Sequence, residues 1–200
     1  MSWSATAILF LSLLIRLPAN AHLAQEGNIS IYAGPLLSRT QFNTTASGQG
    51  PENKTGLGLI VLGDINSRSS LEIGLFYFNK LYLIEKENQL LAEQTDMIHI
   101  TMGYRRWLSE SFALSAAFAS GYSVGDVTVV QNTVIDGSLI NTSARDVTEY
   151  GLDLSALFYV QLQKSWSLVF DTRYSYSLTA KKNEKANHMM ILLGLQHPIR

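Results

Sequence analysis

The chain has 200 residues, with 15 Lys and Arg against 16 Asp and Glu, so its formal net charge is −1. This length suits a single domain, and a charge so close to neutral excludes the strongly basic proteins that bind nucleic acid through electrostatics. There is no cysteine, so disulfide bonds, which often stabilise exported domains with small cores, are not available here.

The first 21 residues predict a cleaved signal peptide. The apolar run from Ala7 to Ile15 is too short for a transmembrane helix, which needs about 20 residues. It is followed by Pro18-Ala19-Asn20-Ala21, where small residues have the spacing of a cleavage site. The alternative is a short helix buried in a core. We therefore expect residues 1–21 to be a signal peptide and residues 22–200 to form the mature domain.

From Gly27 onward, segments of about ten residues alternate between apolar and small or polar side chains. In the clearest segment, Phe112 to Val124, the residues at even positions are mostly large and apolar and those at odd positions are Ala, Ser and Gly. Successive side chains of a strand point to opposite faces, and alternating segments of about ten residues are typical of transmembrane β-strands. Similar segments cover residues 29–42, 57–65, 71–78, 98–105, 150–162, 166–179 and 188–196. In the first of these, Pro35 indicates a bulge or a bent start.

The connections between these segments alternate between short and long. Short polar turns are expected at residues 66–69, 109–111 and 163–165, and longer polar loops at 44–55, 85–96, 132–146 and 181–187. Outer-membrane barrels have short periplasmic turns and long external loops. The pattern predicts an all-β fold: an eight-stranded antiparallel up-and-down transmembrane β-barrel.

Aromatic residues near the strand ends are expected to face the membrane interfaces, where rings with a polar tip are enriched. The alternative for each of them is ordinary packing across neighbouring strands. The set is Trp107, Phe112, Tyr122, Tyr150, Trp166 and Tyr176.

The repeated strand–turn–strand units, such as Gly103 to Leu114 with the sequence GYRRWLSESFAL, resemble the bacterial outer-membrane β-barrel domain family of small porin-like and opacity-type surface proteins. The resemblance covers the chain from Ala21 onward. It implies a location in the bacterial outer membrane and assembly by the barrel-assembly machinery, and it carries over no catalytic residue. Members of this family commonly end on a strand with a terminal aromatic residue, whereas residues 195–200 here are LQHPIR.

Several charged residues fall on the rows that would point into the barrel. Because eight strands leave an interior filled by side chains, and because an isolated buried charge is very costly, these residues should form a polar network. We expect Arg105 and Arg173 to be neutralised by some of Glu72, Asp153 and Asp171. The inward set is Asp64, Glu72, Lys80, Arg105, Asp153, Asp171 and Arg173. Such a network would either plug the barrel or line a narrow, selective pore.

No local motif indicates catalysis. His99 and His188 could approach Ser120, Ser123 or Asp96 near the loops, but no nucleophile elbow accompanies them. We therefore predict a non-enzymatic outer-membrane protein with a structural or surface role, adhesion through the loops included, and with no cofactor and no metal.

The alternatives are a narrow passive channel for ions or small solutes, a lipid-modifying enzyme, and a soluble exported barrel with its apolar residues inside. The expected partners are outer-membrane lipid, lipopolysaccharide at the basic stretch Lys181 to Lys185, and an unknown extracellular ligand of the loops.

Overall fold

The computed structural model describes residues 24–40, 53–86, 89–132, 148–163, 166–179, 184–185 and 187–199. The predicted signal peptide at 1–21 lies outside these residues. No helix among the described residues is long and apolar enough to span a membrane. The strands are β1 (Ile29–Thr40), β2 (Asn53–Asn66), β3 (Ser69–Lys86), β4 (Gln89–Trp107), β5 (Phe112–Asn132), β6 (Glu149–Gln163), β7 (Trp166–Ser177), the two-residue β8 (Glu184–Lys185) and β9 (His188–Pro198).

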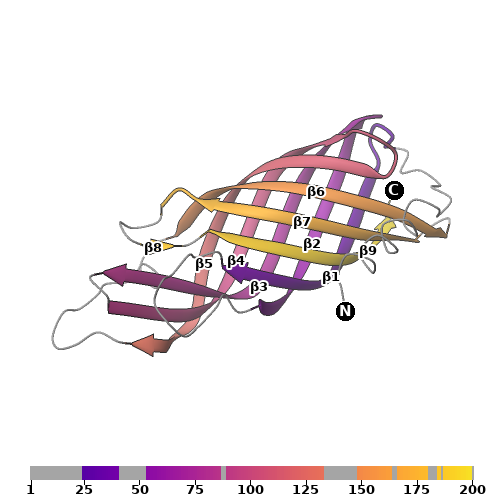
Figure 1. Cartoon of the computed structure of the whole chain (residues 1–200). Helices are drawn as coiled ribbons and strands as arrows, with labels where there is room; N and C mark the ends of the chain where they lie inside the picture. Colours follow the sequence, from indigo (N-terminus) through magenta and orange to yellow (C-terminus); the bar gives the residue numbers. More distant parts are fainter. Residues whose placement is uncertain are drawn as a thin grey trace, which may run out of the picture.

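Eight of these strands close into a barrel. Neighbours pair antiparallel in the order β2-β1-β9-β7-β6-β5-β4-β3, and β2 also pairs with β3, which joins the two ends of the sheet. The result is a tilted cylinder (Figure 1), and β8 pairs with Leu83 and Ile84 of β3. Closure pairs the backbone groups of every wall strand, which is what a sheet in lipid requires. The predicted eight-stranded antiparallel barrel is confirmed.

The short turns gather at one end of the cylinder. β1 begins beside the end of β9, since Ser30 pairs with Pro198. At the same end, the Trp107 amide donates to the Arg68 carbonyl of the β2–β3 turn, and the Tyr159 amide donates to Ser111 of the β4–β5 turn. We call this the turn end, and the opposite end the loop end.

One predicted loop is wrong. Residues 85–96 were expected to form a long polar loop, but β3 continues to Lys86 and β4 begins at Gln89, with paired residues throughout. The run Glu85 to Gln89 is rich in polar residues and so resembles a loop, yet Glu85 pairs with Leu90 and Lys86 pairs with Gln89, which gives these residues the backbone partners that a loop would have to find in water.

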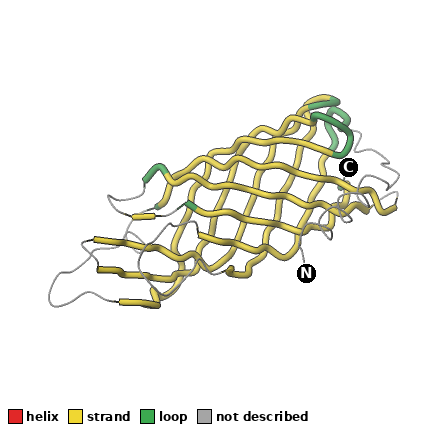
Figure 2. The backbone as a smooth tube through the Cα atoms, viewed as in Figure 1, coloured by secondary structure: helices red, strands yellow, loops and turns green. Residues whose placement is uncertain are grey.

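The hairpin makes part of the barrel wall taller than the rest. β3, β4 and β5 have 18, 19 and 21 residues, against 12 in β1 and in β7. The β5–β6 ladder ends at the pair Gly121 and Glu149, so β5 runs on for eleven residues to Asn132. These three strands extend beyond the rim at the loop end, at the lower left of Figure 1 and of Figure 2.

The bulge expected at Pro35 is not found. The β1–β2 ladder runs without a register shift from Ile29 to Arg39. On the other side of β1, the pairs of Ala33 with Leu195 and of Leu36 with Leu192 keep one register across the proline. Pro35 removes a single backbone N–H donor from β1. Before and after the proline, β1 is paired with both β2 and β9.

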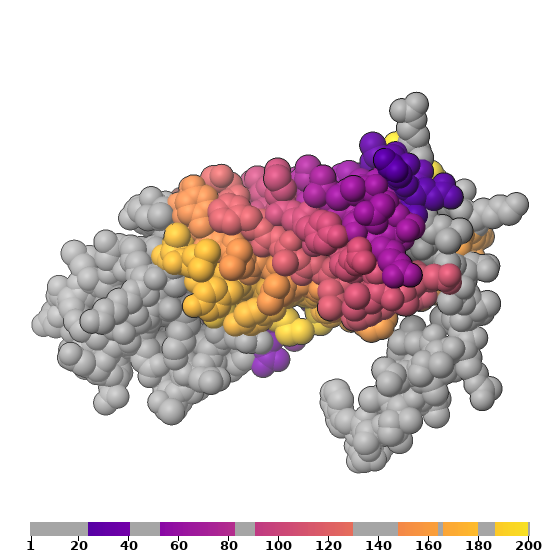
Figure 3. Space-filling view, turned by 90° about the horizontal axis from the view of Figure 1, so that it is seen from above, coloured from indigo at the N-terminus to yellow at the C-terminus, as the bar shows by residue number. Residues whose placement is uncertain are grey.

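The barrel presents an apolar wall to its surroundings. Along β6, Leu154 is 59% exposed while its neighbour Asp153 is 1% exposed, and this alternation continues around the wall. Figure 3 looks onto one face of it, where side chains of β2 to β5 lie against one another. The large apolar residues that are exposed include Leu57, Leu71, Ile73, Leu75, Met102, Leu114, Phe118, Leu152, Leu154, Phe158, Phe170, Leu193 and Leu195. An apolar surface of this extent is far beyond what a soluble monomer exposes, so the wall faces lipid.

Because the wall faces lipid, an exposed leucine on it should not tolerate a charged substitution, whereas an exposed residue of a soluble protein usually would. Leu154→Arg should lower the free energy of unfolding from phospholipid vesicles by about 2–4 kcal/mol, because a charge near the bilayer centre is costly. The control Glu110→Arg, in the exposed β4–β5 turn, should change it by less than about 0.5 kcal/mol. Equal effects of the two substitutions would contradict a membrane-embedded wall.

Candidate functional site: the closed lumen

The inside of the barrel has an apolar side and a polar side. Strands β1, β2, β3 and β9 contribute fully buried apolar side chains: Tyr32, Leu36, Ile60, Leu62, Phe76, Phe78, Met190 and Leu192. Strands β4 to β7 contribute mainly small and polar ones: Thr101, Arg105, Ser115, Ala117, Asp153, Ser155, Asp171, Arg173 and Ser175. The lumen therefore contains a packed apolar core as well as a polar network.

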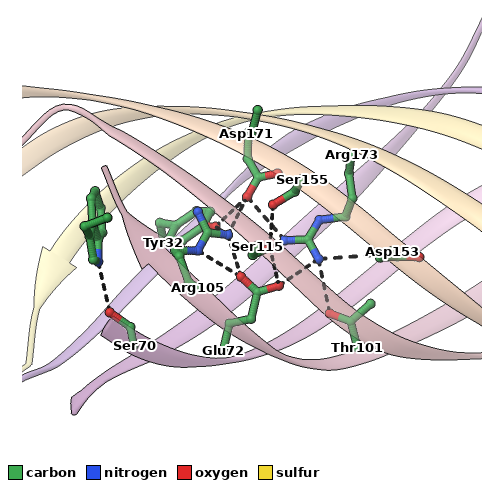
Figure 4. Close-up of polar contacts among 12 residues, drawn as sticks. Tyr32, Ser70, Glu72, Thr101, Arg105, Ser115, Asp153, Ser155, Asp171 and Arg173 are labelled. Atoms are coloured by element: carbon green, nitrogen blue, oxygen red, sulfur yellow. Dashed lines mark hydrogen bonds and ion pairs between the residues drawn. The ribbon is translucent and has the colours of Figure 1, made fainter. Parts of the chain in front are cut away.

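Glu72 stands at the centre of the polar network (Figure 4). Arg105 donates from Nε and Nη2 to Glu72 Oε2, at 2.9 and 2.6 Å. Arg173 donates from Nη1 to Oε1 at 3.0 Å, and the Ser115 hydroxyl donates to the same oxygen at 3.2 Å. Because Glu72 lies on β3 and Arg173 on β7, this carboxylate connects strands that are not neighbours in the wall.

Asp171 is the second carboxylate that the two arginines share. Its Oδ2 accepts hydrogen bonds from Arg105 Nη2 at 2.9 Å and from Arg173 Nη2 at 3.3 Å. The Tyr32 hydroxyl donates to the same oxygen at 2.8 Å and accepts from Arg105 Nη2 at 3.2 Å. The Arg173 guanidinium also lies over the Phe76 ring, 5.1 Å from its centroid, a favourable cation–π arrangement.

Asp153 connects the arginines to a pair of histidines nearer the loop end. Its Oδ2 lies 3.9 Å from Arg173 Nη1 and shares a 3.0 Å hydrogen bond with His99 Nε2. The His99 ring meets His188 edge to face at 5.4 Å, and both rings pack against Phe78.

Two further clusters lie beyond this one. Toward the loop end, Lys80 Nζ donates to both carboxylate oxygens of Glu149 at 2.6 Å, and the Tyr82 hydroxyl donates to Glu149 Oε2 at 2.9 Å. Because Lys80 belongs to β3 and Glu149 to β6, this ion pair crosses the lumen.

At the turn end, the Trp107 indole N–H donates to Ser70 Oγ at 3.0 Å, and the Ser70 hydroxyl donates to Asp64 Oδ1 at 2.7 Å. The Trp107 ring meets Tyr159 edge to face. Side chains thus fill the lumen at successive levels from one end to the other.

Of the seven inward residues expected to form the network, the structure brings five together, and Lys80 pairs with Glu149 instead. The five are Glu72, Arg105, Asp153, Asp171 and Arg173. Asp64 lies apart, with Ser70 and the backbone amide of Gln25 as partners. Sequence reasoning missed Tyr32 and Glu149. Tyr32 was detectable as an inward position of β1, whereas the position of Glu149 opposite Lys80 depends on how far β3 extends beyond the rim.

The membrane-interface assignment of Trp107 is wrong. This side chain is 4% exposed and lies inside the barrel. It is two residues after Arg105 and therefore on the same inward row. Its closeness to a turn suggested an interface position, but the alternation along the strand directs its side chain inward. The other five aromatics, Phe112, Tyr122, Tyr150, Trp166 and Tyr176, belong to outward rows, and their interface role stays a prediction.

Within the described residues, no group of three or more His, Cys, Asp or Glu side chains is placed to hold a metal ion. His99, which the sequence analysis considered for catalysis, pairs with Asp153. Its ring also lies near the rings of Phe76, Phe78 and His188. The arrangement suits mutual neutralisation of buried charges.

Comparisons with known proteins agree with the fold. No protein-family model and no curated protein sequence matches the chain. Among solved structures, it is similar to Ail, the attachment invasion locus protein of Yersinia pestis, with 14% identity, a TM-score of 0.52, and coverage of 88% of this chain and 100% of that one. Ail has also been solved in complex with the heparin analogue sucrose octasulfate.

A second similar structure is the outer membrane protein OprG from Pseudomonas aeruginosa, with 13% identity, a TM-score of 0.51, and coverage of 88% and 97%. Identities this low relate the folds and nothing finer. The fold and the lipid-facing wall define the class: this is a small transmembrane β-barrel protein with eight strands in its wall.

The inward position of Trp107 has a spectroscopic consequence. In a barrel of residues 22–200, which lacks Trp3, refolded into bilayers, the variant Trp166→Phe keeps only Trp107 and should show little quenching by brominated acyl chains. The matched variant Trp107→Phe, which keeps Trp166 on the outer wall at 45% exposure, should be quenched strongly. Strong quenching of Trp107 would place it in lipid and overturn its assignment.

The buried network predicts strong coupling between Glu72 and Arg105. Removing one partner leaves the other charge buried without compensation, so Glu72→Gln or Arg105→Met should each cost about 3–5 kcal/mol of unfolding free energy. The double variant should cost less than the sum of the two, by about 0.5–3 kcal/mol. A double-mutant cycle in urea measures this, and additive effects would show that the two groups do not interact.

Proposed function

We propose that this protein is a non-enzymatic structural and surface protein of the outer membrane, and that its barrel is plugged. The observation that carries the proposal is the crossing of the lumen by ion pairs at two levels, one fully buried and one partly buried. Glu72 and Asp171 bridge Arg105 and Arg173 in the middle, and Glu149 holds Lys80 nearer the loop end. In a small eight-stranded barrel, side chains can fill the whole interior.

The apolar half of the lumen supports the same proposal. Ile60, Leu62, Phe76 and Leu192 pack against one another and against Tyr32 as a hydrophobic core does. An aqueous path would have to separate apolar surfaces that are stable in contact and would have to replace paired charges by water. A narrow pore lined by the charged side chains is the second candidate, since β4, β6 and β7 contribute Arg105, Asp153, Asp171 and Arg173 to the interior.

The surface role rests on the part of the barrel that stands beyond the rim. β3, β4 and β5 extend it at the loop end, which is the outer end if the short turns face the periplasm, as in other outer-membrane barrels. The similar protein Ail carries attachment in its name and was solved with a heparin analogue, which supports the adhesive form of the proposal.

Lipopolysaccharide contact at Lys181 to Lys185 and delivery by the barrel-assembly machinery stay predictions. The structure does not describe the side chains of that basic stretch.

Single-channel conductance distinguishes a plugged barrel from a narrow pore. The refolded barrel in planar bilayers should give no unitary current steps, because the ion pairs and the apolar core fill the lumen. Unitary steps in the wild-type protein, with a conductance that changes on Lys80→Gln or Arg173→Gln, would contradict the plug and favour the narrow channel. A heat-modifiability gel of the same sample shows that folded barrel was present.

A further inference from the structure

The lipid-facing wall carries one arginine at its turn end. Arg106 follows the buried Arg105 on β4 and therefore points outward, where it is exposed. Its neighbours on the wall are apolar: Leu114 faces it across the β4–β5 ladder, and Leu108 follows it on the same row. Arg106 thus lies where the apolar band meets the turns.

The arginine is held against the wall by a defined set of hydrogen bonds. Its Nη1 donates to Ser69 Oγ at 3.0 Å, and the same hydroxyl shares a 2.6 Å hydrogen bond with the Tyr104 hydroxyl. Ser69 pairs with Arg106 in the β3–β4 ladder and is 1% exposed, so its hydroxyl is covered. The contact uses one of the five N–H groups of the guanidinium and fixes the position of the others.

A second cation lies next to it. Arg68, in the β2–β3 turn, directly precedes Ser69, is exposed, and accepts the Trp107 amide at its carbonyl. Within the described part of the chain, neither Arg68 nor Arg106 forms an ion pair with an acidic residue. The arginines inside the lumen, by contrast, each contact two or more carboxylates.

We propose that Arg106, positioned by Ser69 and Tyr104 and assisted by Arg68, binds the phosphodiester of a net-anionic glycerophospholipid in the leaflet at the turn end. A cation at the boundary of the hydrocarbon lowers its energy by reaching a headgroup phosphate, and a guanidinium fits phosphate oxygens with two parallel hydrogen bonds. The acyl chains of the same lipid would lie on the exposed Leu71, Ile73 and Met102 above it. The inference rests on the proposed location in the outer membrane.

The test is lipid retention by the full barrel. The refolded protein is placed in nanodiscs of phosphatidylcholine with an equal amount of phosphatidylglycerol, and the lipids that stay bound are counted by native mass spectrometry. Wild type should retain phosphatidylglycerol about fivefold over phosphatidylcholine, the preference that one interfacial arginine supplies. Arg106→Gln should abolish the preference, and Arg106→Lys should keep part of it because the charge remains.

The matched control is Arg39→Gln, since Arg39 is an exposed, outward-facing arginine near the loop end of β1. It should leave the preference unchanged. An unchanged preference in Arg106→Gln, or an equal loss in Arg39→Gln, would overturn the proposal. Displacement of the lipid by millimolar inorganic phosphate would also overturn it, because the site would then bind free anions.

A heat-modifiability gel of each variant shows whether the barrel has folded, so a failure of membrane insertion can be distinguished from a failure of the lipid site. If the wild-type barrel does not insert and fold in bilayers, the proposed membrane function fails. If it folds but shows no lipid preference, only the phospholipid site fails.

Discussion

The carboxylate of Glu72 accepts hydrogen bonds from arginines of two different strands, and the inside of the barrel is organised around it. In lipid, a β-sheet must close so that all its backbone groups are paired. Closure with eight strands leaves a narrow interior that side chains can fill. Charges in that space are tolerated only as a mutually compensating group. Glu72, Asp171, Arg105 and Arg173 form such a group, and it connects strands that are not neighbours in the wall.

The same constraint explains why so much of the architecture could be predicted from sequence. In a transmembrane strand, side chains point alternately to lipid and to the lumen, so apolar and polar residues alternate in the sequence. Residues such as Leu154 and Asp153 can therefore be assigned to opposite faces without knowledge of the fold. The pairing of Arg105 and Arg173 with nearby carboxylates follows from the cost of burying them. The partners could not be chosen in advance, because barrel closure and register decide that Glu72, and not Asp64, lies between the two arginines.

The errors have a common physical origin as well. Polar composition at Glu85 to Gln89 suggested a loop, although a hairpin can continue beyond the membrane because water does not penalise polar side chains there. Trp107 was placed at an interface from its residue type, although its position in the alternating row directs it inward. In both cases, periodicity and pairing decided the structure more strongly than composition did. The apolar half of the lumen was also missed, since strands apolar on both faces, such as β2 with Ile60 and Leu62, have no visible contrast between the faces.

The proposed function requires a barrel whose apolar rows face lipid and whose interior is closed to solvent. Because the chain contains no cysteine, single cysteines can be introduced one at a time along β6 and β7 and tested with reagents confined to lipid or to water. The cysteines of Leu152→Cys, Leu154→Cys and Phe158→Cys should react only with the lipid-soluble reagent. Those of Ser155→Cys and Ser175→Cys should react with neither reagent in the folded state. Rapid reaction at 155 and 175 with a small water-soluble thiol reagent would show an open lumen and contradict the proposed function.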